Sequence, residues 1–127
     1  MSRRRLQIAV SAVFVAVIGL GARYVFAQET LQDQDLMPLY QQTGHVLFGD
    51  NTPEARVDWS NLGKEYGTEQ TFNDDSIEIL IDRDLVTSEK QLREVMQHEV
   101  CHVYVDRRGG EDVEHGPIFQ TCISRFE

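Results

Sequence analysis

Residues 98–102 of the chain are His-Glu-Val-Cys-His, the pattern HExxH. In a helix, His98 and His102 lie one turn apart on the same face. Neutral imidazoles at that spacing can occupy two corners of a zinc tetrahedron. Glu99 is rotated by about 100° from His98, which brings a carboxylate near the metal without making it a ligand. The segment therefore predicts a zinc site with a general base beside it.

A catalytic zinc site requires a third protein ligand and an open position for water. The metzincin pattern is excluded, because it needs Gly and His at the positions of Val105 and Arg108. Asp106 is also excluded, because eight residues of straight helix separate it from His98 by about 12 Å. The third ligand must therefore come from outside this helix.

His115 is the only histidine after the motif, and it is the predicted third ligand. Gly109 and Gly110 allow the chain to turn back toward the first helix. Glu114 is the rival ligand, because carboxylates also bind zinc. His45, far upstream, is expected to be an ordinary surface or capping histidine.

A capped helix is predicted to carry the motif. Ser88 has the character of an N-cap, and Gln91 follows it at capping-box spacing. The helix is expected to run to about Val105, before a glycine-containing break. Its apolar positions recur with helical periodicity: Leu92, Val95, Met96 and Val103.

The remaining elements complete an α+β fold in the order α-β-β-β-α-α. We expect an N-terminal helix over 35–42 that ends at Gly44, and a last helix that begins at Pro117. Alternating or apolar runs predict three strands, at 55–59, 66–72 and 77–81. We expect these strands to form a small antiparallel sheet beside the HExxH helix and the C-terminal helix.

The N-terminal segment has the three parts of an export signal. Arg3–Arg5 are positive, residues 6–22 are mainly apolar, and Val25-Phe26-Ala27 resembles a cleavage site. Residues 1–27 are therefore predicted to be a signal peptide, with features of the twin-arginine type, or an uncleaved membrane anchor. In both cases the positive-inside rule places the domain at 28–127 outside the cytoplasm, secreted or periplasmic.

The charge of the chain argues against nucleic-acid binding. Of the 12 basic residues, four arginines precede Gln28, whereas all 21 acidic residues follow it. The part after the predicted signal therefore has 8 basic and 21 acidic residues, a formal charge of −13. Phosphate backbones repel such a surface, so the expected partner is a protein or peptide substrate. The sequence indicates no particular oligomeric state, and a membrane contact only through the N-terminal segment.

Two cysteines remain, Cys101 inside the HExxH helix and Cys122 in the last helix. In an exported protein they would form a disulfide that joins the two helices. The alternative is a pair of small buried thiols that pack as hydrophobic side chains.

The motif, the short loop after it and the segment His115-Gly116-Pro117-x-Phe119 together resemble the SprT-like metallopeptidases. The resemblance extends over about residues 33–126. It implies a minimal zincin fold, a zinc ion held by His98, His102 and His115, and Glu99 as the catalytic acid and base. The Spartan-type enzymes of this family act on proteins attached to DNA, a role that acidity and export make unexpected here.

The sequence therefore predicts an exported zinc metallopeptidase with Glu99 as general base. One alternative is a binding or adaptor module in which zinc is structural and turnover is negligible. Another is a metal-dependent hydrolase of a non-peptide amide, for example in cell-wall material. The sequence identifies no residue that stabilises the oxyanion. Tyr66 and Tyr104 are candidates, although both are expected to be core or surface tyrosines.

Overall fold

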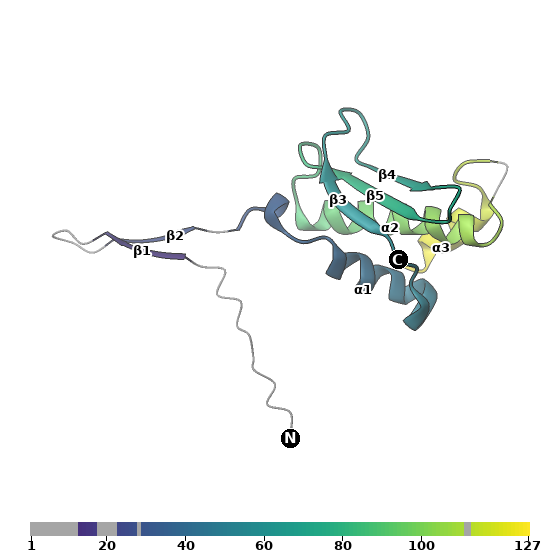
Figure 1. Cartoon of the computed structure of the whole chain (residues 1–127), viewed down its shortest axis with the longest axis horizontal. Helices are drawn as coiled ribbons and strands as arrows, with labels where there is room; N and C mark the ends of the chain where they lie inside the picture. The colour runs from purple at the N-terminus through teal and green to yellow at the C-terminus, as the bar shows by residue number, and fades with distance from the viewer. Residues whose placement is uncertain (1–12, 18–22, 28, 111–112) are drawn as a thin grey trace, which may run out of the picture. The chain divides into compact units, whose positions relative to one another are not determined.

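The computed structural model describes residues 13–17, 23–27, 29–110 and 113–127 (Figure 1). The chain divides into two compact units, Met1–Gln34 and Asp35–Glu127. The second unit carries the predicted site.

The first unit contains two paired strands. Strand β1 (Val13–Val17) pairs antiparallel with β2 (Arg23–Ala27), and a short 3-10 helix, η1, follows at Leu31–Asp33. The apolar run predicted as signal or anchor falls partly on residues 1–12 and 18–22, which lie outside the described residues. Across the described part of the chain, no helix is both long and apolar enough to cross a bilayer. Cleavage, anchoring and export stay predictions.

The second unit contains a three-stranded mixed sheet. It is built from β3 (Arg56–Ser60), β4 (Gly67–Thr71) and β5 (Ile77–Asp82), in the order β3-β5-β4. Strands β4 and β5 are antiparallel, whereas β3 and β5 are parallel.

The prediction of a purely antiparallel sheet is therefore wrong, and the burial of β5 supplies the reason. The side chains of Ile77, Ile79 and Ile81 are almost completely buried. A strand this apolar is most stable in the centre, between two more polar edge strands. The chain consequently passes from β3 to the far edge before β5 fills the gap.

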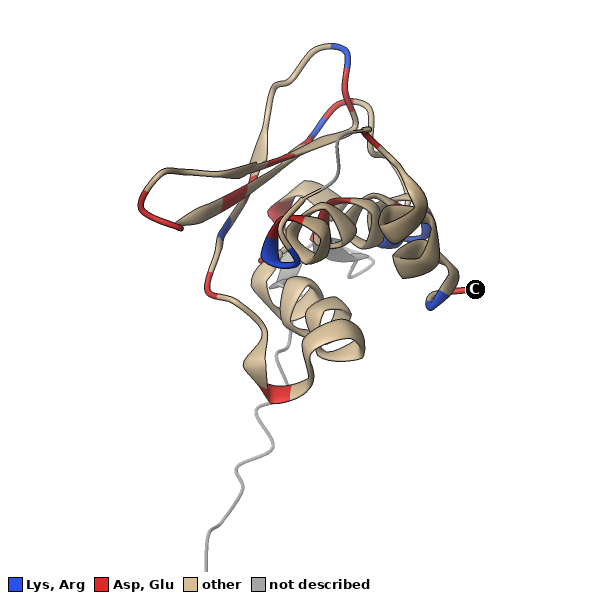
Figure 2. Cartoon of the chain, turned by 90° about the vertical axis from the view of Figure 1, so that its right-hand side faces the viewer, with Lys and Arg blue, Asp and Glu red and all other residues tan. Residues whose placement is uncertain are grey.

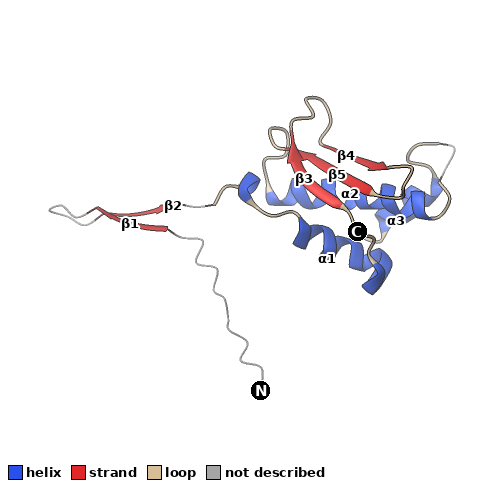
Figure 3. Ribbon diagram, viewed as in Figure 1, coloured by secondary structure: helices blue, strands red, loops and turns tan. Residues whose placement is uncertain are grey.

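Three α-helices cover one face of this sheet (Figure 3). They are α1 (Met37–Phe48), which continues into the 3-10 helix η2 (Gly49–Asn51), α2 (Glu89–Arg107) and α3 (Pro117–Ser124). Helix α2 packs against β4 and β5, and both α1 and α3 pack against α2. The α+β class and the small helix-and-sheet domain are confirmed.

Helix α1 is longer than predicted, because Gly44 lies inside it rather than at its end. A Cβ atom at Gly44 would collide with the Thr52 side chain, so this glycine serves close packing. The helix ends instead at Gly49, whose φ of 59° is left-handed.

Helix α2 begins where the sequence predicts. The Ser88 hydroxyl accepts a hydrogen bond from the Gln91 N–H at 3.1 Å. Its buried apolar face consists of Leu92, Met96, Val100 and Val103. The helix runs two residues beyond the predicted Val105, and its last carbonyls are capped when the chain turns at two positive-φ glycines.

Candidate metal centre

Three histidine side chains converge beside α2. The Nε2 atoms of His98 and His102 are 3.2 Å apart, and those of His115 lie 3.1 and 3.2 Å from them. His98 and His102 come from successive turns of α2, whereas His115 comes from the segment just before α3. Among the described residues, these three are the one group of potential ligands placed to hold a metal ion.

The histidine triangle fits a tetrahedral metal ion. Two ligands about 2.05 Å from a tetrahedral zinc are about 3.3 Å apart, close to the separations here. Without a cation, the three nitrogens cannot all form favourable contacts with one another, because each Nε2 is either a hydrogen-bond donor or an acceptor. Of three such nitrogens at least two have the same role, so at least one contact is repulsive. A central cation turns all three lone pairs inward and removes this conflict.

Burial keeps the α2 imidazoles in the form that binds metals. Desolvation, helped by the neighbouring His102 and His115, lowers the pKa of His98 to about 4. Desolvation, with the charge of His115 second, also lowers the pKa of His102. Both rings are therefore neutral near pH 7, as a zinc ligand must be.

One aromatic ring supports all three imidazoles. The Phe119 ring centroid is 4.9, 4.8 and 4.7 Å from those of His98, His102 and His115. Phe119 itself is buried among residues of α2 and α3. It therefore holds His115 against the helix that carries the other two histidines.

The backbone at His115 is held in an uncommon conformation. Its φ is 56°, in the left-handed region that non-glycine residues rarely adopt. The Gln120 amide nitrogen donates to the His115 carbonyl at 3.1 Å, and α3 begins two residues after His115. Glu114, the rival third ligand, is exposed, with its carboxylate 3.8 Å from the His115 Nε2. The structure thus brings His115, and not Glu114, into the triangle.

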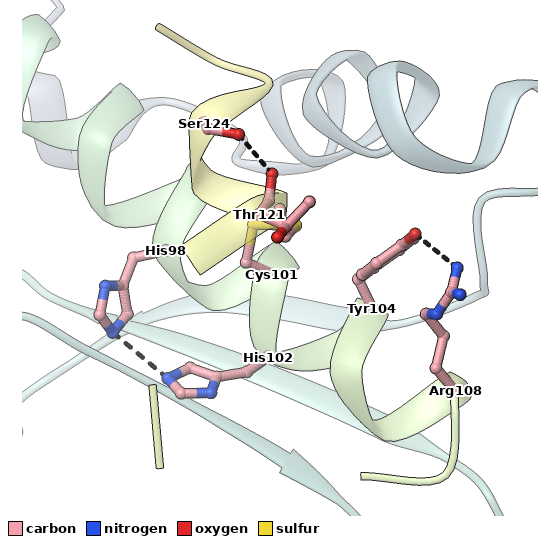
Figure 4. The surroundings of a disulfide bond; sticks show 8 residues. His98, Cys101, His102, Tyr104, Arg108, Thr121 and Ser124 are labelled. Atoms are coloured by element: carbon pink, nitrogen blue, oxygen red, sulfur yellow. Dashed lines mark hydrogen bonds between the residues drawn. A yellow bond between two sulfur atoms is a disulfide. The ribbon is translucent and has the colours of Figure 1, made fainter. Parts of the chain in front are cut away.

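A disulfide between Cys101 and Cys122 joins α2 to α3 (Figure 4). Their Cα atoms are 5.8 Å apart, and both residues are completely buried. Of the two alternatives left open by the sequence, the disulfide is the one in the structure. Cys101 lies between His98 and His102 in the sequence, and Cys122 lies about one helical turn after Phe119. The disulfide therefore fixes α2 and α3 to each other next to the histidines.

Glu99 lies beside the triangle without joining it. Only 4% of its surface is exposed, and Gly67 of β4 approaches so closely that a Cβ there would lie 2.9 Å from its Oε1. Burial, reinforced by the charges of Glu69 and then Glu65 and Glu114, raises the pKa of Glu99 to about 8. Because Gly67 has no side chain, the Glu99 carboxylate fits between β4 and α2.

The triangle and Glu99 share one cavity of about 750 Å³. Its walls are formed by β4 with the loop before it, by α2, and by the segment before α3. The lining residues are Glu65, Tyr66, Gly67, Thr68, Glu69, Gln91, Glu94, Val95, His98, Glu99, His102, Glu114 and His115. This volume is within the range of ligand-binding clefts.

Of three further candidates from the sequence, His45 and Tyr104 lie outside the cavity and Tyr66 lines it. His45 is exposed on α1, 3.8 Å from Asp50, as expected of a surface histidine. Tyr104 accepts a hydrogen bond from Arg108 at 2.7 Å and does not line the cavity, whereas Tyr66 does. Tyr66 therefore remains the tyrosine placed near the site.

The sequence prediction missed the β4 wall. Gly67, Glu69 and Thr71 alternate along β4 and therefore share the face toward α2. This alternation could have indicated that the three residues face α2. The strand is polar, however, and therefore resembles an ordinary solvent-exposed edge strand. The role of Gly67 depends on the long-range approach to Glu99, which no local pattern reveals.

Together, the mixed sheet, the HExxH helix and the three-histidine centre define a metallopeptidase-like domain with a potential metal site. A family model described as the SprT-like family matches residues 36–127, and the chain belongs to this family. The match spans nearly all of the second unit. A comparison with curated proteins finds no match.

Proposed function

We propose that the protein is a zinc-dependent metallopeptidase. The observation that carries the proposal is the convergence of three imidazole nitrogens within 3.2 Å, with the buried carboxylate of Glu99 in the same cavity. His98, His102 and His115 would hold the ion. Zinc bound there would supply a Lewis acid that polarises a scissile carbonyl and a water molecule.

The chain's own residues supply the proton transfer and the orientation. Glu99 would accept a proton from the attacking water and return it to the leaving amine. A cation held by the three histidines would favour the ionised carboxylate that this role needs, against the pKa of about 8 that burial gives Glu99. Its burial between Gly67 and α2 fixes the carboxylate and restricts competing water. Tyr66, at the start of the cavity wall, is placed to contact the substrate.

An extended peptide is the substrate that the cavity supports best. Strand β4 lines the cavity, and within the described sheet it pairs with β5 on one side only. The backbone groups of its other edge can pair with a peptide strand, which gives affinity independent of side chains. A cell-wall amide would not use this edge in the same way.

The proposal includes export and excludes a nucleic-acid partner. The positive N-terminus and apolar run support export, and the acidic composition disfavours phosphate backbones. An adaptor module with structural zinc is the weaker alternative, because it gives no reason for a buried carboxylate that faces the metal cavity.

The proposal is tested with the zinc-loaded full chain on a peptide library, with cleavage detected by mass spectrometry. Glu99→Gln is the matched variant, since it removes the base but keeps nearly the same shape. We expect cleavage by the native chain and a loss of at least about 100-fold in the variant, with zinc content unchanged. Equal cleavage by both would contradict the role of Glu99.

A further inference from the structure

The cavity around the histidine triangle is lined by acidic side chains. Five carboxylates contribute to its wall, and no Lys or Arg does so among the described residues. They are Glu65, Glu69, Glu94, Glu99 and Glu114. Burial raises the pKa of Glu99 to about 8 and that of Glu69 to about 7, so these two carry less than a full charge near neutral pH. The other three carboxylates, those of Glu65, Glu94 and Glu114, give the cavity its acidic character.

These carboxylates come from three separate segments that meet around the cavity. Glu65 and Glu69 belong to the loop before β4 and to β4 itself, Glu94 to α2, and Glu114 to the segment before α3. Asp and Glu occur widely over the sheet and helices in Figure 2, but the five named here line one open cavity. A cleft with low-dielectric walls focuses such charges onto whatever enters it.

The internal partners of these carboxylates leave most of the charge uncompensated. Lys90 approaches Glu94 at 3.7 Å on the exposed surface of α2, where such a pair is weak. Glu69 accepts a hydrogen bond from the neutral hydroxyl of Thr71 at 2.7 Å.

Glu99 is directed at the same cavity. Only 4% of its surface is exposed, and its side chain forms part of the cavity wall. Burial disfavours the charged form of this carboxylate, and a cation bound beside it would offset that cost. The acidic wall therefore surrounds a position that favours a bound cation.

The acidity is concentrated on one side of the histidines. A second cavity shares Glu94, His98 and His115 with the first and continues toward α3. Its wall there is mixed. Phe119, Ile123 and Phe126 are apolar, whereas Gln97, Gln120 and Glu127 are polar. A peptide that crosses the metal centre thus meets several carboxylates on the β4 side and a mixed wall with a single further carboxylate on the α3 side.

We propose that the site selects peptides with a lysine or arginine on the β4 side of the scissile bond. This inference rests on the proposed peptidase function and names its substrate class. The cation would lie among Glu65, Glu69 and Glu114, while the peptide backbone pairs with β4. Acidic peptides are rejected by repulsion within the same cavity.

The test measures peptide binding rather than hydrolysis. A wrong prediction of substrate preference can therefore be told apart from a wrong prediction of catalysis. Three labelled nonapeptides, identical except for Lys, Gln or Glu at two positions, are titrated against the zinc-loaded full-length Glu99→Gln variant. Fluorescence anisotropy at low salt should show the Lys peptide binding at least about tenfold more tightly than the Glu peptide. High salt should reduce this difference.

Charge reversal provides the matched control. Adding Glu65→Lys should abolish most of the preference, whereas Glu54→Lys changes the net charge equally but lies outside the cavity and should preserve it. Equal affinities for the Lys and Glu peptides, or equal losses from both reversals, would overturn the inference. A chain that prefers Lys peptides but hydrolyses none in its native form would contradict the proposed function alone.

Discussion

At the scale of single residues, the short distances between the three histidine nitrogens favour a bound cation. Three mutually facing Nε2 atoms cannot all be hydrogen bonded to one another, yet Phe119, Gln120 and the disulfide hold them in place. Sequence spacing predicted the pair on α2 directly. It also predicted His115 as the third ligand, with Glu114 as the rival. The structure adds the reason why the His115 side chain turns inward, which is the left-handed backbone of that residue.

Removal of His115 should therefore weaken the metal site far more than removal of its neighbour. We expect His115→Ala to lower zinc affinity by at least about 100-fold, more than a typical loss of an outer-shell partner. Glu114→Ala should change it by less than about tenfold, the low end for such partners. Competition with a chromophoric chelator measures both, and the reverse ranking would assign the third ligand to Glu114.

At the scale of elements, Asp82 joins the cavity wall to the HExxH helix. One carboxylate oxygen accepts the N–H groups of Leu62 and Gly63 at 2.6 and 3.0 Å. The other accepts those of Asp84 and Leu85, both at 2.8 Å. These bonds, the one from Leu85 first, lower the pKa of Asp82 to about 2. The sequence did not reveal this role, because the partners lie on two different loops.

Because the pKa of Asp82 is lowered on folding, ionised Asp82 stabilises the fold above its ordinary pKa. This contribution disappears as pH falls from about 4 to about 2. At pH 7 we expect Asp82→Asn to lower the melting temperature by at least about 5 °C, and the exposed control Asp84→Asn to lower it little. Melting curves at pH 7 and at about pH 2 should show that the difference in melting temperature between the native chain and Asp82→Asn becomes small in acid. A difference that does not change with pH would contradict this account.

The disulfide also links two elements, α2 and α3, and its contribution to the free energy of unfolding can be measured directly. It closes a separation of 21 residues, for which chain entropy gives about 3 kcal/mol of stabilisation. The Cys101→Ala/Cys122→Ala chain, compared with the oxidised native chain in urea, should lose about that free energy of unfolding. An unchanged midpoint would show that packing alone holds α2 and α3 together.

At the scale of the whole molecule, charge and strand order differ in how well sequence predicts them. The α+β class and the helices that carry the site followed from periodicity and capping. The mixed sheet did not, because strand order depends on which strand is buried most deeply, and that is settled only when β5 meets α2. Net charge needs no structure, and it predicts no salt-sensitive binding to DNA. A gel-shift titration with duplex DNA that weakens steeply with salt would refute that expectation.

One zinc ion at the histidine triangle is proposed to activate this chain as a peptidase. The most direct measurement is the initial rate of peptide hydrolysis by the metal-free full chain as zinc is added. The account predicts a rate that rises from near zero and reaches its maximum at one zinc per chain, with Glu99→Gln flat throughout. Hydrolysis that ignores zinc, or full activity in Glu99→Gln, would contradict it.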